Sequence, residues 1–255
     1  TGSIELLAGS FSNLSGREVM RCKVLVIVGT RPEAIKMAPV ILALRGCQEI
    51  SCCVLATAQH RHMLDQVMKV FDIKPDIDLD VMRPNQTLTA LTARLLTGLD
   101  EVLLGEHPDV VLAQGDTTTV MTAALTCFYH RIPFGHVEAG LRTWDLQNPF
   151  PEEMNRVIAG RLAKWYFAPT ESSRQNLLRE GVSDTDIVVT GNTVIDALLS
   201  VVDRDVELPV ELDPTKRLIL VTAHRRENFG EPFERVCHAV RALLERNQDV
   251  QVLYP

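Results

Sequence analysis

Three acidic motifs stand close together in the middle of this sequence. They read GDTTT at residues 115–119, HVEAGLRT at 136–143 and FPEE at 150–153. The runs VVLAQ and IPFGHV, which lead directly into the first two acids, are apolar and typical of buried strands. Carboxylates at the ends of buried strands are costly unless they move protons or bind polar ligands. The stretch therefore predicts an active site, and an enzyme.

Each acidic motif also has a purely structural interpretation. Asp116 and the threonines after it could cap a helix, and Glu152 and Glu153 are favoured in a first helical turn whatever their role. Glu138 is either ion-paired with an arginine such as the nearby Arg142 or poised for proton transfer. Because Asp116 and Glu138 both follow strands, the functional interpretation of GDTTT is favoured.

A further motif, GTRPE, lies between the first strand-like run and the first helix-like segment. Thr30 can cap that helix, and Glu33 stands where a capping box needs an acid. A helix N-terminus after a strand is also a natural anion site, to which Arg31 and Lys36 would add charge for a diphosphate. Both interpretations are open. The sequence contains neither GxGxxG nor GxxxxGK[ST], so it supports no dinucleotide fingerprint and no P-loop.

Two further polar motifs follow strand-like runs. AQH ends the second run, where Gln59 and His60 could contact a ligand, although a polar turn is favoured on spacing alone. AHRRENFG follows the first strand of the second half of the chain. His224 and Arg225 at that junction suit a phosphate, because a plain surface turn seldom combines such residues at the end of a buried strand.

The elements that must position these residues alternate along the chain. Amphipathic segments such as 120–129, 154–162 and 173–179 separate short β-branched runs. The predicted strands are residues 24–28, 51–56, 110–113, 132–137, 165–168 and 187–190. Strands that alternate with helices form parallel sheets covered on both faces. The sequence thus predicts an α/β, doubly wound, Rossmann-like domain.

The domain organisation is expected to have four parts. Residues 1–21 are expected to be a disordered leader or a cloning remnant, and 22–197 the N-terminal Rossmann-like domain. The acidic, proline-containing segment 198–216 is expected to be a linker. Residues 217–255 are expected to start a second, C-terminal domain, whose AHRRENFG motif suits a phosphate. Two strands and a helix cannot bury a core by themselves, so we expect this second domain to be incomplete in the chain.

The bulk composition narrows the class of protein. The chain has 255 residues, of which 46% are hydrophobic and 23% charged. Its formal net charge of −7 argues against a general nucleic-acid binder. No apolar run approaches the roughly 18 residues that a membrane span needs. Six cysteines without CxxC spacing argue against a thiolate zinc site and favour a reduced, cytosolic compartment.

Taken together and in order, the motifs resemble the non-hydrolysing UDP-N-acetylglucosamine 2-epimerases. The matching segments are GTRPEAIKMAPV, AQHR followed by MLDQV, GDTTT, GHVEAGLRT, PEEMNR, GNTVIDAL and TAHRREN. They extend from about Lys23 to Pro255, so the resemblance spans nearly the whole chain. It implies a GT-B-like fold of two Rossmann-like domains, the second truncated here, with the active site in the cleft between them.

The resemblance also implies an activity. Members of this family interconvert UDP-GlcNAc and UDP-ManNAc, a precursor of bacterial surface polysaccharides, by anti elimination of UDP to a 2-acetamidoglucal and its re-addition. No metal or redox cofactor is implied. The expected partner is a UDP-sugar, with no nucleic acid and no membrane, in a cytoplasmic protein that is a homodimer when full length. The alternatives are a hydrolysing 2-epimerase that releases UDP and ManNAc, and a non-catalytic fragment that binds sugar nucleotides.

Residue roles follow from the same resemblance. Asp116, Glu138 and Glu152 are implied as the acid/base candidates, and His224 as the group that stabilises the departing UDP. The residues implied to bind the substrate are Arg31, Lys36, Gln59, His60, Arg142 and Arg225.

Overall fold

The computed structural model describes most of the chain, in two compact units. The described residues are 21–57, 61–83, 85–204, 210–222 and 230–254. The first unit is Thr1–Asp203 and the second is Arg204–Pro255. The expected leader, apart from Arg21, lies outside the described residues.

The first unit is built on a seven-stranded sheet in which every neighbouring pair is parallel. In chain order the strands are β1 (Cys22–Val28), β2 (Ile50–Ala56), β3 (Ile77–Asp78), β4 (Val110–Gln114), β5 (Phe134–Val137), β6 (Trp165–Ala168) and β7 (Ile187–Val189). Their order across the sheet is β3-β2-β1-β4-β5-β6-β7. The prediction of a doubly wound parallel sheet is therefore confirmed.

Most predicted strands differ from the observed ones by one or two residues at one end, and two differences have a clear physical reason. The strand expected at 132–137 begins only at Phe134. Proline has no backbone N–H for the ladder, so Pro133 contributes only its carbonyl, which accepts from the N–H of Val111 at 3.1 Å. Strand β3 was not predicted, because its two residues are too few to show any periodicity.

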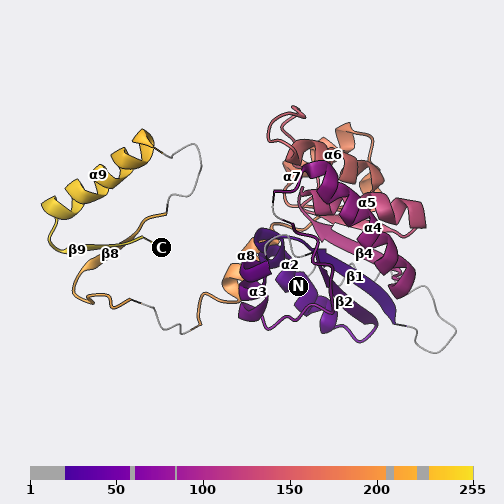
Figure 1. Ribbon diagram of the computed structural model, residues 1–255, viewed down its shortest axis with the longest axis horizontal. Helices are drawn as coiled ribbons and strands as arrows, with labels where there is room; N and C mark the ends of the chain where they lie inside the picture. Colours follow the sequence, from indigo (N-terminus) through magenta and orange to yellow (C-terminus); the bar gives the residue numbers. More distant parts are fainter. Residues whose placement is uncertain (1–20, 58–60, 84, 205–209, 223–229, 255) are drawn as a thin grey trace. The chain divides into compact units, whose positions relative to one another are not determined.

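Helices cover both faces of the sheet (Figure 1). On one face lie α2 (Arg31–Arg45), α3 (Arg61–Val70) and α8 (Thr193–Leu199), and on the other lie α4 (Leu88–Glu106), α5 (Thr118–His130), α6 (Glu152–Leu162) and α7 (Glu171–Arg179). A short 3₁₀ helix, Asp184–Asp186, precedes β7. Successive strand residues point to opposite faces, so Val24 and Val26 pack in one core and Leu25 and Ile27 in the other.

The direction of the chain reverses between β1 and β4. After β1 the chain winds outward through β2 and β3, and it then returns to place β4 on the other side of β1. The helices that follow these two central strands, α2 and α5, start at the same edge of the sheet. Ligands of open α/β sheets bind outside the carboxyl ends of the strands at such a reversal. This edge is where the acidic motifs lie.

The second unit is a single βαβ segment. Strand β8 (Arg217–Leu220) pairs in parallel with β9 (Val250–Leu253), and α9 (Glu231–Arg246) connects them. The pattern expected to restart near residue 217 is present. Val250 is the one buried residue among the described residues of this unit, and α9 buries none. A segment of this size leaves apolar side chains such as Leu220 exposed.

A separate observation concerns membranes. Within the described parts of the chain, no helix combines the length and apolar character needed to cross a bilayer.

Candidate active site

Helix α2 begins with a complete capping box. The Thr30 hydroxyl accepts from the N–H of Glu33 at 3.4 Å. Oε2 of Glu33 accepts in return from the N–H groups of Gly29 at 2.6 Å and Thr30 at 2.7 Å. Both amides therefore already donate to a carboxylate of the protein itself. The capping box predicted for GTRPE is present.

Glycine at position 29 is required by the packing around this turn. A Cβ there would lie 2.7 Å from Oγ1 of Thr119 and 2.8 Å from Oγ1 of Thr57. Those two hydroxyls are themselves 3.3 Å apart. The backbone after β1 thus approaches the start of α5 more closely than any other residue would allow.

Lys36, one turn further along α2, forms an ion pair with Glu138 at the end of β5. Its Nζ lies 2.5 Å from Oε2 of Glu138, and the two side chains are 22% and 13% exposed. Nε2 of Gln114, the last residue of β4, donates to the same oxygen. The backbone of Glu138 is left-handed, with φ of 64°. Such a conformation in a residue other than glycine costs about 1 kcal/mol or more, and it concentrates at functional sites.

Arg142 is not the partner of Glu138, contrary to one of the sequence interpretations. Its guanidinium forms a bidentate ion pair with the Glu180 carboxylate, with hydrogen bonds of 2.6 Å and 2.9 Å. It also donates to the carbonyl of Leu141 at 2.7 Å. The Arg142 and Glu180 side chains are only 1% and 9% exposed. The guanidinium therefore ties the loop after β5 to the C-terminal end of α7, and the structure does not bring it to the carboxylates.

Helix α6 binds both the side chain and the backbone of Asp116. Nη2 of Arg156 lies 2.6 Å from Oδ2 of Asp116. Nδ2 of Asn155 donates to the Asp116 carbonyl at 2.9 Å. Both partners come from the PEEMNR motif, so the helix that starts with the third acidic motif also fixes the first.

The pKa of Asp116 is raised by its burial and by its acidic neighbours. Burial raises this pKa above its ordinary value, and the guanidinium of Arg156 opposes that rise. The charges of Glu152 and Glu138 raise it further, whereas Lys36 lowers it. The structure therefore brings together four of the residues predicted from the sequence, at the carboxyl ends of β4 and β5.

The two adjacent glutamates of FPEE differ in their surroundings. Glu153 is buried, and its Oε1 accepts from the N–H groups of Thr143 at 2.9 Å and Trp144 at 3.0 Å. Its Oε2 lies 3.4 Å from Nε of Arg156. Glu153 therefore holds the loop between β5 and α6 in place. Glu152 is half-buried at the first position of α6 and is the member of the pair that acts on Asp116.

His136, on β5, supports the turn that carries Asp116. It is fully buried, and its Nε2 lies 2.7 Å from the carbonyl oxygen of Gly115, a residue with φ of 92°. Burial lowers the pKa of His136 to about 4, so the ring is neutral near pH 7 and donates its Nε2 proton to that carbonyl. Its Nδ1 has no hydrogen-bond partner among the described residues.

Sequence reasoning did not assign roles to Gln114, His136, Glu153 or Arg156. A polar residue closing the apolar run VVLAQ was a usable signal for Gln114. Arg156 stands one helical turn after Glu152, a spacing that places both on one helix face. A buried histidine gives no such signal, because its burial depends on the neighbouring strands.

The structure does not place the remaining predicted residues at this cluster. Arg31 is exposed at the first position of α2. Gln59, His60, His224 and Arg225 lie outside the described residues. Within the described ranges, no group of three or more His, Cys, Asp or Glu side chains could hold a metal ion.

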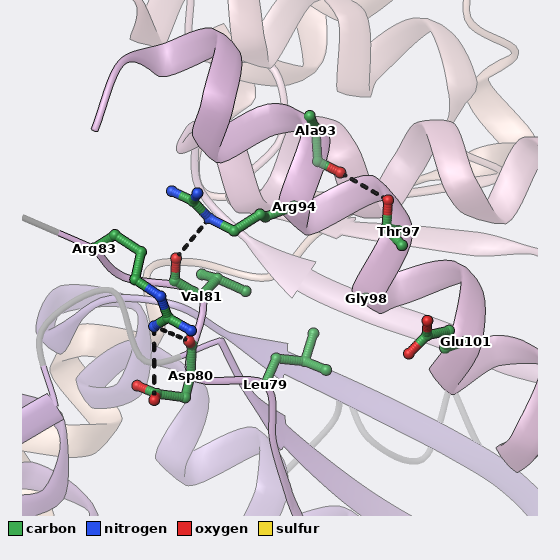
Figure 2. Close-up of a pocket in the computed structure, with 9 residues that line it drawn as sticks. All are labelled: Leu79, Asp80, Val81, Arg83, Ala93, Arg94, Thr97, Gly98 and Glu101. Carbon is green, nitrogen blue, oxygen red and sulfur yellow. Dashed lines mark hydrogen bonds and ion pairs between the residues drawn. The ribbon is translucent and has the colours of Figure 1, made fainter.

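A pocket of about 400 Å³ lies elsewhere, between residues 79–83 and helix α4. Figure 2 shows that the arginines on its rim are engaged by nearby backbone: Arg94 donates to the carbonyl of Val81 at 3.1 Å and Arg83 to that of Asp80 at 2.9 Å. None of the predicted site residues lines it. It is therefore separate from the carboxylate cluster.

Comparisons with known proteins identify the family of this chain. Residues 42–255 match the model of the family described as UDP-N-acetylglucosamine 2-epimerase. A Yersinia pestis protein of that name is 56% identical over an alignment of 243 residues, and the match covers 91% of this chain and 65% of the relative. The chain thus spans about 65% of the length of the curated relatives it matches.

Solved structures support the fold. The UDP-GlcNAc 2-epimerase of Neisseria meningitidis, solved with UDP-GlcNAc bound, is 45% identical with a TM-score of 0.80 over 91% of this chain and 65% of that one. A lipopolysaccharide outer core galactosyltransferase, only 15% identical with a TM-score of 0.52 over 91% and 68% of the two chains, shares the fold alone. The predicted GT-B-like α/β class is confirmed. Because the family model covers most of the sequence, the chain belongs to the UDP-N-acetylglucosamine 2-epimerase family.

Proposed function

We propose that the full-length protein interconverts UDP-GlcNAc and UDP-ManNAc, and that this chain supplies the carboxylate side of the active site. The observation that carries the proposal is the Lys36–Glu138 ion pair beside Asp116 and Glu152, at the strand ends where open α/β sheets bind ligands. The family membership agrees with it, and the Neisseria meningitidis relative was solved with UDP-GlcNAc bound.

The proposed reaction inverts one carbon centre. A base removes the proton from C2 of the sugar, and the electron pair of that C–H bond forms the C1–C2 double bond. The C1–O bond breaks, and UDP leaves with its electrons to give a 2-acetamidoglucal. UDP then adds back at C1 while C2 takes a proton on the opposite face, so no proton is gained or lost overall. Such a reaction needs a base and an acid on opposite faces of the sugar, and cations at the diphosphate.

Asp116, Glu138 and Glu152 are the proposed acid and base groups. Since burial and neighbouring carboxylates raise the pKa of Asp116, this side chain holds a proton more readily than an ordinary aspartate, which suits a general acid. Lys36, Arg31 and Arg225 are proposed to face the sugar-phosphate, with Gln59 and His60 as the other substrate contacts. Arg142, which is buried and bound to Glu180, is proposed to hold the loop after β5 rather than to contact substrate. His224 is proposed to stabilise the departing UDP.

The test is proton NMR of UDP-GlcNAc in D₂O with the full-length protein. We expect the C2 proton signal to disappear as UDP-ManNAc forms, because the returning proton comes from solvent. Asp116→Asn and Glu138→Gln should each slow this exchange by at least about 100-fold. Unchanged exchange in both variants would show that these carboxylates take no part in the reaction.

Two alternatives predict other products in the same experiment. A hydrolysing 2-epimerase would accumulate free UDP and ManNAc in equal amounts, and the reaction would not run backward. A non-catalytic binding protein would show saturation transfer from protein to UDP-GlcNAc with the C2 proton intact. Reversible formation of UDP-ManNAc separates the proposed activity from both.

We also propose a cytoplasmic location, a homodimeric full-length protein and a role in making surface polysaccharide precursors. All six cysteines are free thiols, as a reduced compartment requires. Light scattering of the full-length protein would test the dimer: a monomer mass at micromolar concentration would contradict it.

A further inference from the structure

Glu33 links the starts of two helices that carry site residues. It is buried, and its Oε2 binds the amides of Gly29 and Thr30 at the start of α2. Its Oε1 accepts from the Thr117 hydroxyl at 2.6 Å. Thr117 is the N-cap of α5 and itself accepts from the N–H of Val120 at 3.4 Å. A single carboxylate therefore joins the N-terminus of α2 to that of α5.

The residues of the proposed site lie directly beside this link. Asp116 immediately precedes Thr117 in the chain, and Lys36 follows Glu33 by about one helical turn. The Glu33–Thr117 hydrogen bond is thus a very short path through the protein between Lys36 and Asp116. We therefore expect a change in this hydrogen bond to shift one of these side chains relative to the other.

A second connection joins the same two parts of the molecule. Lys36 binds Glu138, and Gln114 of β4 donates to the same Glu138 oxygen. Helix α2 is thereby connected to the β4–α5 segment near Glu33 and again near Lys36. One connection would leave the helix able to pivot, whereas two separated connections fix its direction.

We propose that Glu33 is a positioning residue, whose bond to Thr117 sets the separation of Lys36 and Asp116. This proposal rests on the proposed function, because it names a further residue of the same site. Glu33 is not expected to contact substrate, since both of its oxygens are engaged by the protein.

Burial and hydrogen bonding act on the charge of Glu33 in opposite directions. Burial is the larger influence and raises the pKa of Glu33, whereas the Thr117 hydroxyl and the amides of Gly29 and Thr30 favour the ionised form. The N-termini of α2 and α5 add their partial positive charge. A charged acceptor also makes shorter, stronger hydrogen bonds than a neutral one, which suits a residue that fixes a distance.

The test compares threonine variants of the full-length protein. Thr117→Val keeps the side-chain shape and removes the hydroxyl that Glu33 binds, and Thr117→Ser keeps the hydroxyl. Thr87→Val is the matched control, because Thr87 caps α4 in the same way, accepting from the N–H of Ala90 at 3.1 Å, away from the site. Thr87→Val removes one helix cap without touching the Glu33 link.

We expect Thr117→Val to lower kcat by about 10- to 100-fold, because small misplacements of catalytic groups have effects of this size. Its KM should change far less. Thr117→Ser should recover most of the loss, and Thr87→Val should leave kcat unchanged. Glu33→Ala should behave like Thr117→Val if it folds. A kcat of Thr117→Val within twofold of the Thr87→Val value would overturn the proposal.

A second readout does not depend on turnover. With carboxyl-labelled aspartate, NMR titration follows Asp116, whose pKa is set by burial and by Arg156, Glu152, Glu138 and Lys36. Lys36 lowers this pKa, so loosening α2 should raise it in Thr117→Val but not in Thr87→Val. An identical Asp116 titration in the two variants would overturn the positioning role. If the wild-type protein fails to epimerise, the proposed function fails, and the titration still decides the role of Glu33.

Discussion

The Nζ of Lys36 lies 2.5 Å from Oε2 of Glu138, although the two residues are far apart in the sequence. Gln114 donates to the same carboxylate oxygen. Glu138 is therefore held both by a helix and by a neighbouring strand, in a left-handed backbone conformation that few residues other than glycine adopt. The orientation of this carboxylate depends directly on helix α2.

Lys36→Met should abolish most of the epimerisation that we propose. The variant keeps the length of the side chain but removes the cation beside Glu138, so we expect kcat/KM to fall by about 100-fold or more. Lys23→Met is the matched control, because Lys23 pairs with Glu106 at 2.6 Å near the opposite edge of the sheet. Proton NMR of the interconversion gives both rates. Equal activity of the two variants would show that Lys36 has no special role.

Arg142→Met should act on stability rather than on substrate binding. Loss of one partner leaves Glu180 buried and unpaired, which costs about 3–5 kcal/mol of unfolding free energy. The double replacement Arg142→Met with Glu180→Met should recover part of this loss. Urea denaturation measures both. Arg174→Met, which breaks the more exposed pair with Asp184, should cost about 1 kcal/mol or less. A raised KM at unchanged stability would instead support the substrate contact implied by the sequence.

His136 should make the protein less stable as the pH falls. The folded state disfavours the protonated ring, since burial lowers the His136 pKa from 6.5 to about 4. Above pH 6.5 both states are neutral; below it the unfolded chain binds the proton first, and stability decreases until the folded ring also protonates near pH 4. Between these two pH values the free energy of unfolding should fall by about 3 kcal/mol because of His136.

The variant His136→Gln isolates that effect. It cannot be protonated, so its unfolding free energy, measured in urea between about pH 7 and pH 4, should decline less steeply than that of the wild type. Other titrating groups contribute equally to both proteins and cancel in the comparison. Parallel curves for the two proteins would contradict the prediction.

Gly140→Ala should destabilise the folded protein far more than Gly181→Ala, although both glycines have φ of 85°. A Cβ at position 140 would lie 2.3 Å from the carbonyl oxygen of Ser173, whereas one at 181 would meet nothing within 4 Å. The first replacement should therefore cost about 4 kcal/mol or more and the second about 1 kcal/mol, the cost of the left-handed conformation alone. Thermal melts of the two variants measure the difference, and similar melting temperatures would refute it.

The fold was largely predictable because its signals are local. The run Trp165–Ala168 was predicted with its observed ends, and Val110–Gln114 differs by a single residue. Apolar runs bounded by turns identify buried strands without knowledge of their neighbours. Helix starts were less accurate: α5 begins at Thr118 rather than Val120, because cap residues are polar and fall outside the apolar pattern.

The acidic residues of the site could be predicted from the sequence, but their ion-pair partners could not. Sequence spacing suggested Arg142 as a partner for Glu138, since the two lie in one motif. The observed partner is Lys36, because the sheet order places β1, and hence α2, close to the end of β5. Which cation meets which carboxylate depends on strand order and side-chain direction, and neither is encoded in short-range spacing.

The short outer strands of the first unit have a consequence for its behaviour in a crowded solution. At one side the sheet ends in β3, with two residues, and at the other in β7, with three. An outer strand offers unpaired backbone groups on which a foreign strand can assemble, and the length of the strand limits how many bonds can form. Each outermost strand of this sheet is therefore a poor template, although β3 pairs with only Leu55 and Ala56 of β2. We expect the first unit to nucleate aggregates when it is partly unfolded rather than when it is folded.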